Sequence, residues 1–266
     1  MTNEGIIFGM PTLIELTDPG DTVSLCQSLN LDLIELNMNM VNFCPENLNP
    51  EEVRKIKDNK AIDFTLHLPE EIDLASFHPS IRRGHLQRCR KALKWSYRAG
   101  IELVNLHINS GIYFTLPQEK VRIYDRYEEK FLDNLMESFE ELTAIAAEKN
   151  IKICLENASN FHFPYIRKAL NKLCTFSEIG LTWDSGHDAA VNFREKEVML
   201  KHKDKISHLH LHDFSNGSDH QVLFTGEVDI EEMLALAAER QLRVIIETKT
   251  ATALEKSVKK LRRYEN

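Results

Sequence analysis

The sequence lacks the features that mark membrane and secreted proteins. No stretch of its 266 residues is apolar over the length that a membrane span requires, and the N-terminus has no basic segment followed by an apolar run. The five cysteines are odd in number and scattered, without the CxxC spacing of metal sites, which is typical of reduced thiols. We therefore expect a soluble, cytoplasmic protein with no membrane partner.

Positive charge and flexible linkers are also scarce. The 33 Lys and Arg residues are outnumbered by 41 Asp and Glu residues, which gives a formal charge of -8. Because non-specific affinity for nucleic acid comes from clustered Lys and Arg, this balance argues against a chain that coats phosphate backbones, although a local basic patch stays open. No Pro-, Gly- or Ser-rich segment divides the chain, so we expect one domain over residues 1–266.

The sequence does contain a regular alternation of apolar runs and amphipathic stretches. Eight β-branched runs predict strands, at residues 6–10, 31–37, 63–69, 102–109, 151–157, 180–186, 206–213 and 242–249. Apolar residues at three- and four-residue spacing predict helices over 85–100, 129–150 and 230–241. This order predicts an α/β fold, a single-domain (β/α)₈ TIM barrel. An open doubly wound sheet is the alternative, but no GxGxxG follows the first strand.

The predicted helices have residues at their ends that suit those positions. Gly100, Asn150 and Gln241 fall where three helices should end before the next strand. Asp229 precedes the helix over 230–241 and has Glu232 three residues on, the outline of a capping box.

Polar residues collect at the carboxyl ends of the predicted strands, where barrel enzymes have their active sites. These residues are His67, His107, Glu156, Asp184, His187, His210 and Glu247, and Glu35 ends the second strand in the same way. One such residue alone is most often an ordinary solvated side chain. Several carboxylates brought together, however, would repel one another unless a cation or shifted pKa values relieved them. Convergence therefore predicts that Glu156, Asp184, His210 and Glu247 bind a divalent metal.

The motifs around these residues resemble those of a known family. They are TLHLP with His67, NLHIN with His107, LEN with Glu156, WDSGH with Asp184 and His187, HLHD with His210 and Asp213, HQVLFTGEVDI from His220, and IIETK with Glu247. In this order, and over nearly the whole chain, they resemble the xylose isomerase-like or endonuclease IV-like TIM barrels. That family includes sugar and sugar phosphate isomerases, epimerases and abasic-site endonucleases.

The resemblance to the epimerases implies one Mn²⁺ or a similar ion (Mg²⁺, Co²⁺ or Zn²⁺) bound by Glu156, Asp184, His210 and Glu247. The two glutamates would also take and return the proton beside the substrate carbonyl, while the metal stabilises an enediolate. His187 would orient the substrate or donate to its oxygen, and its alternative role is to cap the helix that follows. The expected partner is a small sugar-like molecule, and family members often form homo-oligomers.

Aromatic residues after the fourth and fifth strands are candidates for the substrate pocket. Tyr113, Phe114, Phe161, Phe163 and Tyr165 would line a closed pocket and exclude water, or they would pack the loops. Both alternatives stay open from the sequence.

The endonuclease branch implies a larger ligand set and up to three zinc ions. The matching positions are His67, His107, Glu156, Asp184, His187, His210, His220 and Glu247. This chain departs from the pattern at Ser218, where that branch carries Asp. An extended loop would point the adjacent Asp219 elsewhere, whereas a slipped loop would still present Asp219 as a ligand, so the departure weakens the third metal without excluding it. Phe224 also replaces the first glycine of the Gly-x-Gly before the last helices.

Three enzymatic functions remain after these comparisons of motifs. A nuclease acting on abasic DNA needs an open basic groove, whereas the best basic candidates (Arg82, Arg83, Arg88, Arg90, Lys91 and Lys94) lie on an amphipathic helix whose solvated face explains them. Arg82 and Arg83 are alternatively candidates for binding a substrate phosphate. A lyase or dehydratase would use the same proton abstraction as an epimerase. We predict a metal-dependent isomerase or epimerase, with the nuclease and the lyase as alternatives.

Overall fold

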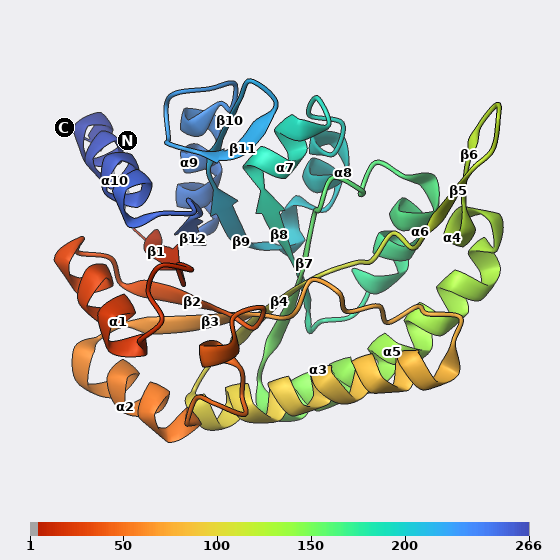
Figure 1. Cartoon of the computed structure of the whole chain (residues 1–266), viewed down its shortest axis with the longest axis horizontal. Coiled ribbons are helices and arrows are strands. Elements are labelled where there is room, and N and C mark those ends of the chain that lie inside the picture. Colours follow the sequence, from red (N-terminus) through yellow and green to blue (C-terminus); the bar gives the residue numbers. More distant parts are fainter. Residues whose placement is uncertain (1–4, 266) are drawn as a thin grey trace.

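Eight parallel strands form a closed barrel, which confirms the predicted TIM-barrel fold and excludes an open sheet (Figure 1). The computed structural model describes residues 5–265. The barrel strands are β1 (Ile7–Pro11), β2 (Leu33–Asn37), β3 (Asp63–His67), β4 (Leu103–His107), β7 (Lys152–Glu156), β8 (Ile179–Asp184), β9 (Ile206–Leu211) and β12 (Arg243–Ile246). Each barrel strand pairs with the next one along the chain, and β12 closes the barrel against β1.

Helices cover the outside of the barrel (Figure 1). They are α1 (Pro19–Ser28), η1 (Val41–Phe43), α2 (Pro50–Lys60), α3 (Pro79–Ala99), α4 (Ile123–Arg126), α5 (Glu128–Lys149), α6 (Pro164–Leu173), α7 (Ser185–Ala190), α8 (Lys196–Lys201), η2 (Lys203–Lys205), α9 (Ile230–Arg240) and α10 (Ala251–Glu265). The three predicted helices are confirmed as α3, α5 and α9. Helix α3 begins earlier than expected, at Pro79, because proline suits the first helical turn, where its missing N–H is not needed. None of the helices within residues 5–265 is long and apolar enough to cross a membrane.

The helix ends agree with the sequence. Gly100, Asn150 and Gln241 each end their helix in the left-handed region, with φ of 76°, 53° and 51°. The side chain of Asp229 accepts a hydrogen bond from the backbone N–H of Glu232 at 2.9 Å, so it caps α9. These local contacts fix where each helix returns the chain to the barrel.

Two hairpins at the rim of the barrel were not predicted. The first pairs β5 (Tyr113–Thr115) with β6 (Lys120–Arg122), and the second pairs β10 (Asp213–Ser215) with β11 (Ser218–Gln221). The strand expected over 206–213 ends as β9 at Leu211. Asn216 and Gly217 then turn the chain, both with positive φ, as a two-residue hairpin turn requires.

The carboxylate of Asp213 fixes the second hairpin to the loop that follows it. Its Oδ2 accepts hydrogen bonds from the backbone N–H of Thr225 at 2.8 Å and of Gly226 at 2.7 Å, and its Oδ1 accepts from Val228 at 3.1 Å. Asp213 is fully buried. This residue of the HLHD motif therefore organises the loops beside the site.

The apolar core joins the barrel to its helices. A single cluster of buried apolar side chains includes Ile34 and Leu66 from barrel strands and Phe131, Phe139 and Leu170 from helices. The rim of the barrel, in contrast, is lined by polar residues from the strand ends and from the two hairpins.

Candidate functional site

The strand ends bring four distant residues to one level of the barrel mouth. Glu156 is the last residue of β7, Asp184 is the last of β8, His210 is the last but one of β9, and Glu247 follows β12. Asp184 and His210 are register partners across neighbouring strands, and the backbone N–H of Glu247 donates to Leu211 O. One ligand atom from each of the four residues lies within 4.8 Å of the other three.

His210 lies at the centre of this group. Its Nδ1 is 2.9 Å from Glu247 Oε2, 3.3 Å from Glu156 Oε1 and 3.8 Å from Asp184 Oδ2. Glu156, Asp184 and His210 are at most 1% exposed, whereas Glu247 retains 15% of its side-chain surface. The four predicted metal ligands therefore meet at one site, where three of them are buried and Glu247 is accessible from the mouth of the barrel.

A second group shares Glu156 with the first. His67 Nε2 lies 3.2 Å from Glu156 Oε2, and His107 Nε2 lies 3.2 Å from Glu156 Oε1. The two imidazole rings contact edge to face, with centroids 5.0 Å apart. His67 and His107, which are both at strand ends, thus lie together on one side of the shared carboxylate.

A third group consists of His187, Asp219 and His220. Asp219 Oδ1 is 2.8 Å from His220 Nδ1, and its Oδ2 is 3.8 Å from His187 Nε2. Of the two alternatives for Asp219, the structure has the one in which its side chain faces the site. The other assumed an extended loop, whereas the tight turn of the β10–β11 hairpin and the positive φ of His220, 55°, direct both side chains to the site. Ser218 is exposed.

His187 approaches the central group from the helix after β8. Its backbone N–H donates to Asp184 Oδ1 at 2.6 Å, so Asp184, and not His187, caps helix α7. The His187 ring is therefore available to the site, with Nδ1 3.6 Å from carboxylate oxygens of both Glu156 and Asp184.

Electrostatics keeps the carboxylates ionised despite their burial. Burial alone would raise the pKa of Glu156, but His210 and His107 hold it well below its ordinary value. Burial likewise opposes the low pKa of Glu247, which His210 and His220 maintain. Although burial disfavours charged imidazole, the neighbouring carboxylates raise the pKa of both His67 and His187 to about 9. In the absence of a cation, the carboxylates and imidazoles of the mouth therefore stabilise one another's charged forms.

Several polar atoms of this site have no hydrogen-bond partner. They include His210 Nδ1, His107 Nε2 and Glu247 Oε2, which are buried near opposite charges but are not aligned for hydrogen bonds. An unsatisfied buried polar atom costs about 1–3 kcal/mol, so three in one place call for a ligand. Imidazole nitrogens mixed with carboxylate oxygens suit Zn²⁺, Mn²⁺ or Co²⁺ better than Mg²⁺. These residues therefore fit a divalent cation.

The aromatic candidates divide between surface and core. Tyr113 and Phe114 are exposed on the β5–β6 hairpin. Phe163 is half-buried, stacks on Tyr165 and has the Arg122 guanidinium 4.0 Å from its ring centre. Phe161 is fully buried in the apolar core, so its assignment to the substrate pocket was wrong and its side chain packs the loop instead.

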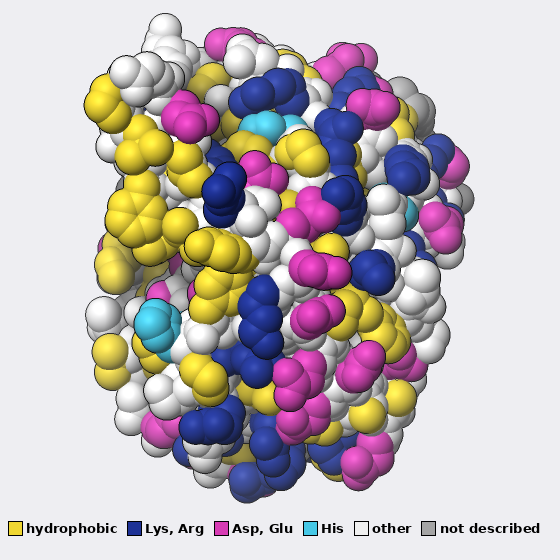
Figure 2. Space-filling model, turned by 90° about the vertical axis from the view of Figure 1, so that its right-hand side faces the viewer, with side chains coloured by type: hydrophobic (Ala, Val, Ile, Leu, Met, Phe, Trp, Pro, Cys, Tyr) yellow, Lys and Arg dark blue, Asp and Glu magenta, His cyan; other side chains and the backbone are white. Residues whose placement is uncertain are grey.

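Half of the six basic candidates on helix α3 are paired with glutamates. Arg82, Arg88 and Arg90 form ion pairs with Glu137, Glu46 and Glu141. On the face drawn in Figure 2, Lys and Arg side chains are interspersed with Asp and Glu and form no continuous basic stripe. Pairing with glutamates also argues against Arg82 as a phosphate ligand.

Sequence reasoning missed residues that support the ligands from behind. Asn157 exchanges two hydrogen bonds with the backbone of Asp184, at 2.7 and 3.0 Å. His212 Nδ1 accepts from the backbone N–H of His220 at 2.8 Å, so its Nε2 faces the Asp184 carboxylate, 3.0 Å away, as a donor. A Cβ on Gly186 would lie 2.1 Å from the His212 ring, which explains the glycine of WDSGH.

Comparisons with known proteins agree with the barrel fold. A family model described as xylose isomerase-like TIM barrel matches residues 23–264. The uncharacterized protein MJ1614 of Methanocaldococcus jannaschii is 29% identical over 204 residues, which cover 74% of this chain and 75% of that protein.

Two solved structures extend the comparison over the whole barrel. A D-tagatose 3-epimerase-like protein is 24% identical, with a TM-score of 0.77 and coverage of 97% of this chain and 96% of that chain. The 3-keto-D-glucoside 4-epimerase YcjR from E. coli is 14% identical, with a TM-score of 0.76 and coverage of 97% and 99%. At these identities the likeness shows the fold.

Proposed function

The chain belongs to the xylose isomerase-like TIM barrel family, and from this premise we propose that it is a divalent-metal-dependent isomerase or epimerase. Its substrate would be a small sugar, sugar phosphate or polyol-type carbonyl compound. The names of the two solved structures, both epimerases or epimerase-like, support this class of reaction.

One observation supports the proposal most strongly. Glu156 and Glu247 come from strands on different sides of His210, and both place a carboxylate oxygen within 3.3 Å of its Nδ1. Two ionised carboxylates on either side of one point can take a proton from a carbon and return it from the other side. An epimerase needs this arrangement because it inverts a carbon beside a carbonyl.

The remaining residues would orient the reacting groups. A cation bound by Glu156, Asp184, His210 and Glu247 supplies polarisation of the substrate oxygens and stabilises the negative charge that develops on them. His220 and Lys249 contact Glu247 at 3.2 and 3.0 Å and fix its orientation. His187, whose Nδ1 contacts the backbone carbonyl of Asn157 at 3.1 Å, would orient the substrate or donate to its oxygen.

Solvent isotope incorporation and metal content test the proposal together. The metal-loaded protein is incubated in D₂O with a panel of ketoses and inosose-like polyols. We expect a converted substrate with one deuterium at the carbon beside the carbonyl, about one equivalent of tightly bound metal per chain, and no turnover after chelation. A product without the label would contradict proton transfer, and loss of water from the substrate would indicate the lyase.

A second candidate function is favoured by the two additional histidine groups. His67 and His107 with Glu156, and His187 and His220 with Asp219, each bring ligand atoms within 4.8 Å of one another. Three cations, one at each of these two groups and one at the four central residues, would suit a zinc-dependent phosphodiesterase acting on abasic DNA. Two or three zinc ions per chain, with cleavage of an abasic oligonucleotide and no conversion of the sugars, would establish this alternative.

A further inference from the structure

We propose that Glu35 is a positioning residue, which orients His210 from inside the barrel through a buried network of polar side chains. Glu35 does not belong to the four proposed metal ligands. The inference rests on the proposed function, because it concerns how strongly those ligands bind a cation.

The interior of this barrel is unusual in its chemistry. Barrel interiors are filled mainly by branched aliphatic side chains. Here five polar side chains from five strands are buried to 3% exposure or less: Glu35, Thr65, Asn105, Thr182 and His208. A buried polar group is costly unless it is hydrogen-bonded, so such a layer needs internal partners.

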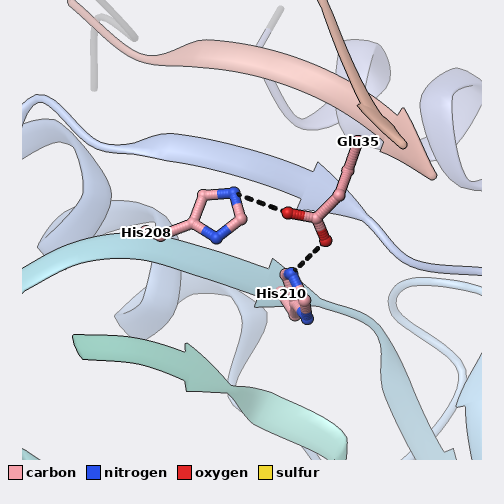
Figure 3. A group of neighbouring side chains, drawn as sticks. All are labelled: Glu35, His208 and His210. Atoms are coloured by element: carbon pink, nitrogen blue, oxygen red, sulfur yellow. Dashed lines mark ion pairs between the residues drawn. The ribbon is translucent and has the colours of Figure 1, made fainter. Parts of the chain in front are cut away.

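Glu35 lies close to Thr65 and His208 in this layer and to His210 next to it. Its Oε1 lies 2.7 Å from His210 Nε2, and its Oε2 accepts a hydrogen bond from Thr65 Oγ1 at 2.9 Å. His208 Nε2 is further away, 3.7 Å from Oε2 (Figure 3). Figure 3 shows the Glu35 carboxylate pointing from its strand towards both rings, so it contacts the side of His210 opposite Nδ1.

A second chain of hydrogen bonds in the same layer, which starts at His208, reaches another proposed ligand. The Thr182 hydroxyl donates to Asn105 Oδ1 at 2.7 Å, and therefore accepts from His208 Nδ1 at 3.2 Å. The Asn105 amide donates to Glu156 Oε2. Two of the four ligands, His210 and Glu156, are thus both supported by the same buried layer.

The position of Glu35 determines which nitrogen of His210 can bind a cation. Both ring nitrogens lie against carboxylates, because Nε2 is 2.7 Å from Glu35 Oε1 and Nδ1 is 2.9 Å from Glu247 Oε2. Nδ1 faces the three other proposed ligands, Glu156, Asp184 and Glu247, whereas Nε2 faces Glu35. When Nδ1 binds a cation, the ring proton therefore stays on Nε2, which donates to Glu35 although its N–H is not fully aligned. Carboxylates that accept from a metal-binding histidine raise metal affinity about 10- to 100-fold.

Cobalt titration of the whole chain tests the inference independently of turnover. The d–d absorption of Co²⁺ reports the binding of each Co²⁺ equivalent. The equivalent whose absorption is missing in His210→Ala is the one that binds to His210. We expect Glu35→Gln to weaken this binding step about 10- to 100-fold. In the His210→Ala background, Glu35→Gln should have no further effect on the remaining steps, because Glu35 acts through His210.

Two further variants separate positioning from general damage to the fold. Thr65→Val removes one donor to Glu35 at nearly constant volume. We expect it to lower the Co²⁺ affinity of the His210-dependent step a few-fold, less than Glu35→Gln does. Asp63→Asn changes another strand carboxylate, which pairs with Arg243 at the opposite end of the barrel, and should leave the titration unchanged.

The outcomes distinguish this inference from the proposed function. A wild-type chain that binds no Co²⁺ would contradict both. If the wild type binds Co²⁺ and Glu35→Gln binds it with equal affinity, the positioning role of Glu35 is overturned and the proposed function is not. Complete loss of one equivalent at any Co²⁺ concentration would also overturn it, because Glu35 would then be a ligand itself.

Discussion

The two ends of the barrel use charged residues differently. At the amino ends of the strands, Asp63 is paired with Lys57 at 2.7 Å and with Arg243 at 3.1 Å. At the carboxyl ends, three carboxylates face histidines, and buried atoms of the group lack hydrogen-bond partners. The first arrangement supplies its own cations and stabilises the fold, whereas the second is completed only by a ligand.

This difference shows which acidic clusters indicate function. Asp63, Lys57 and Arg243 each keep between 20% and 28% of their side-chain surface exposed, so water shares the cost of their charges. Glu156 and Asp184 are almost completely buried, where uncompensated charge is far more expensive. Burial combined with unsatisfied atoms, and not acidity alone, distinguishes the mouth of the barrel.

The largest expected effect comes from the two glutamates of the mouth. Glu156→Gln and Glu247→Gln keep the shape of the side chain but remove the proton acceptor, so each should lower kcat by about 10²- to 10⁴-fold. Turnover is measured with the substrate found in the isotope experiment, and circular dichroism checks the fold.

A matched control uses a glutamate at the other end of the barrel. Glu178→Gln changes a residue directly before β8, whose carboxylate contacts Ser177, and should leave kcat unchanged. If both mouth variants retain the activity of this control, Glu156 and Glu247 are not the acid and base.

The sequence was sufficient to predict the barrel and the convergence of polar residues at its strand ends. In parallel strands the side chains at the carboxyl ends share one level, so Glu156, Asp184 and His210 could be expected to meet once the strands were located. The β-branched apolar runs, separated by stretches with helical spacing, located those strands to within a few residues.

The hairpins and the supporting network were harder to predict. Asn216 and Gly217 are a strong turn pair, and recognising them would have decided between the two alternatives for the loop that contains Asp219. Glu35 was noted only as a strand end, because strand alternation says which face a residue occupies but not which neighbour it contacts. That contact depends on the closure and register of the barrel.

A smaller effect is expected from the second histidine group. His67 contacts Glu156 but is not among the four central residues, so His67→Ala should lower kcat/KM about tenfold and leave one metal equivalent in place. Metal analysis of the purified variant checks this. Loss of a full equivalent, compared with the wild type, would show that His67 binds a metal of its own and would favour the phosphodiesterase.

The smallest functional effect is expected at the amino end. Asp63→Asn removes the partner of Lys57 and Arg243, so it should lower the free energy of unfolding by about 1–2 kcal/mol while kcat and metal affinity stay the same. Denaturant unfolding gives the stability difference. A change in metal affinity would mean that the two ends are coupled through the barrel.

The pH dependence of that stability difference provides a further test. Burial alone would raise the pKa of Asp63, but hydrogen bonds from Lys57 and from the backbone N–H of Phe64, together with the charges of Lys57 and Arg243, lower the pKa below its usual value. The folded chain therefore binds this proton less readily than the unfolded chain, and the ion pair stabilises the fold above pH about 4. The difference in unfolding free energy between wild type and Asp63→Asn should shrink as the pH falls below that value. A constant difference would instead show that packing, not charge, makes Asp63 stabilising.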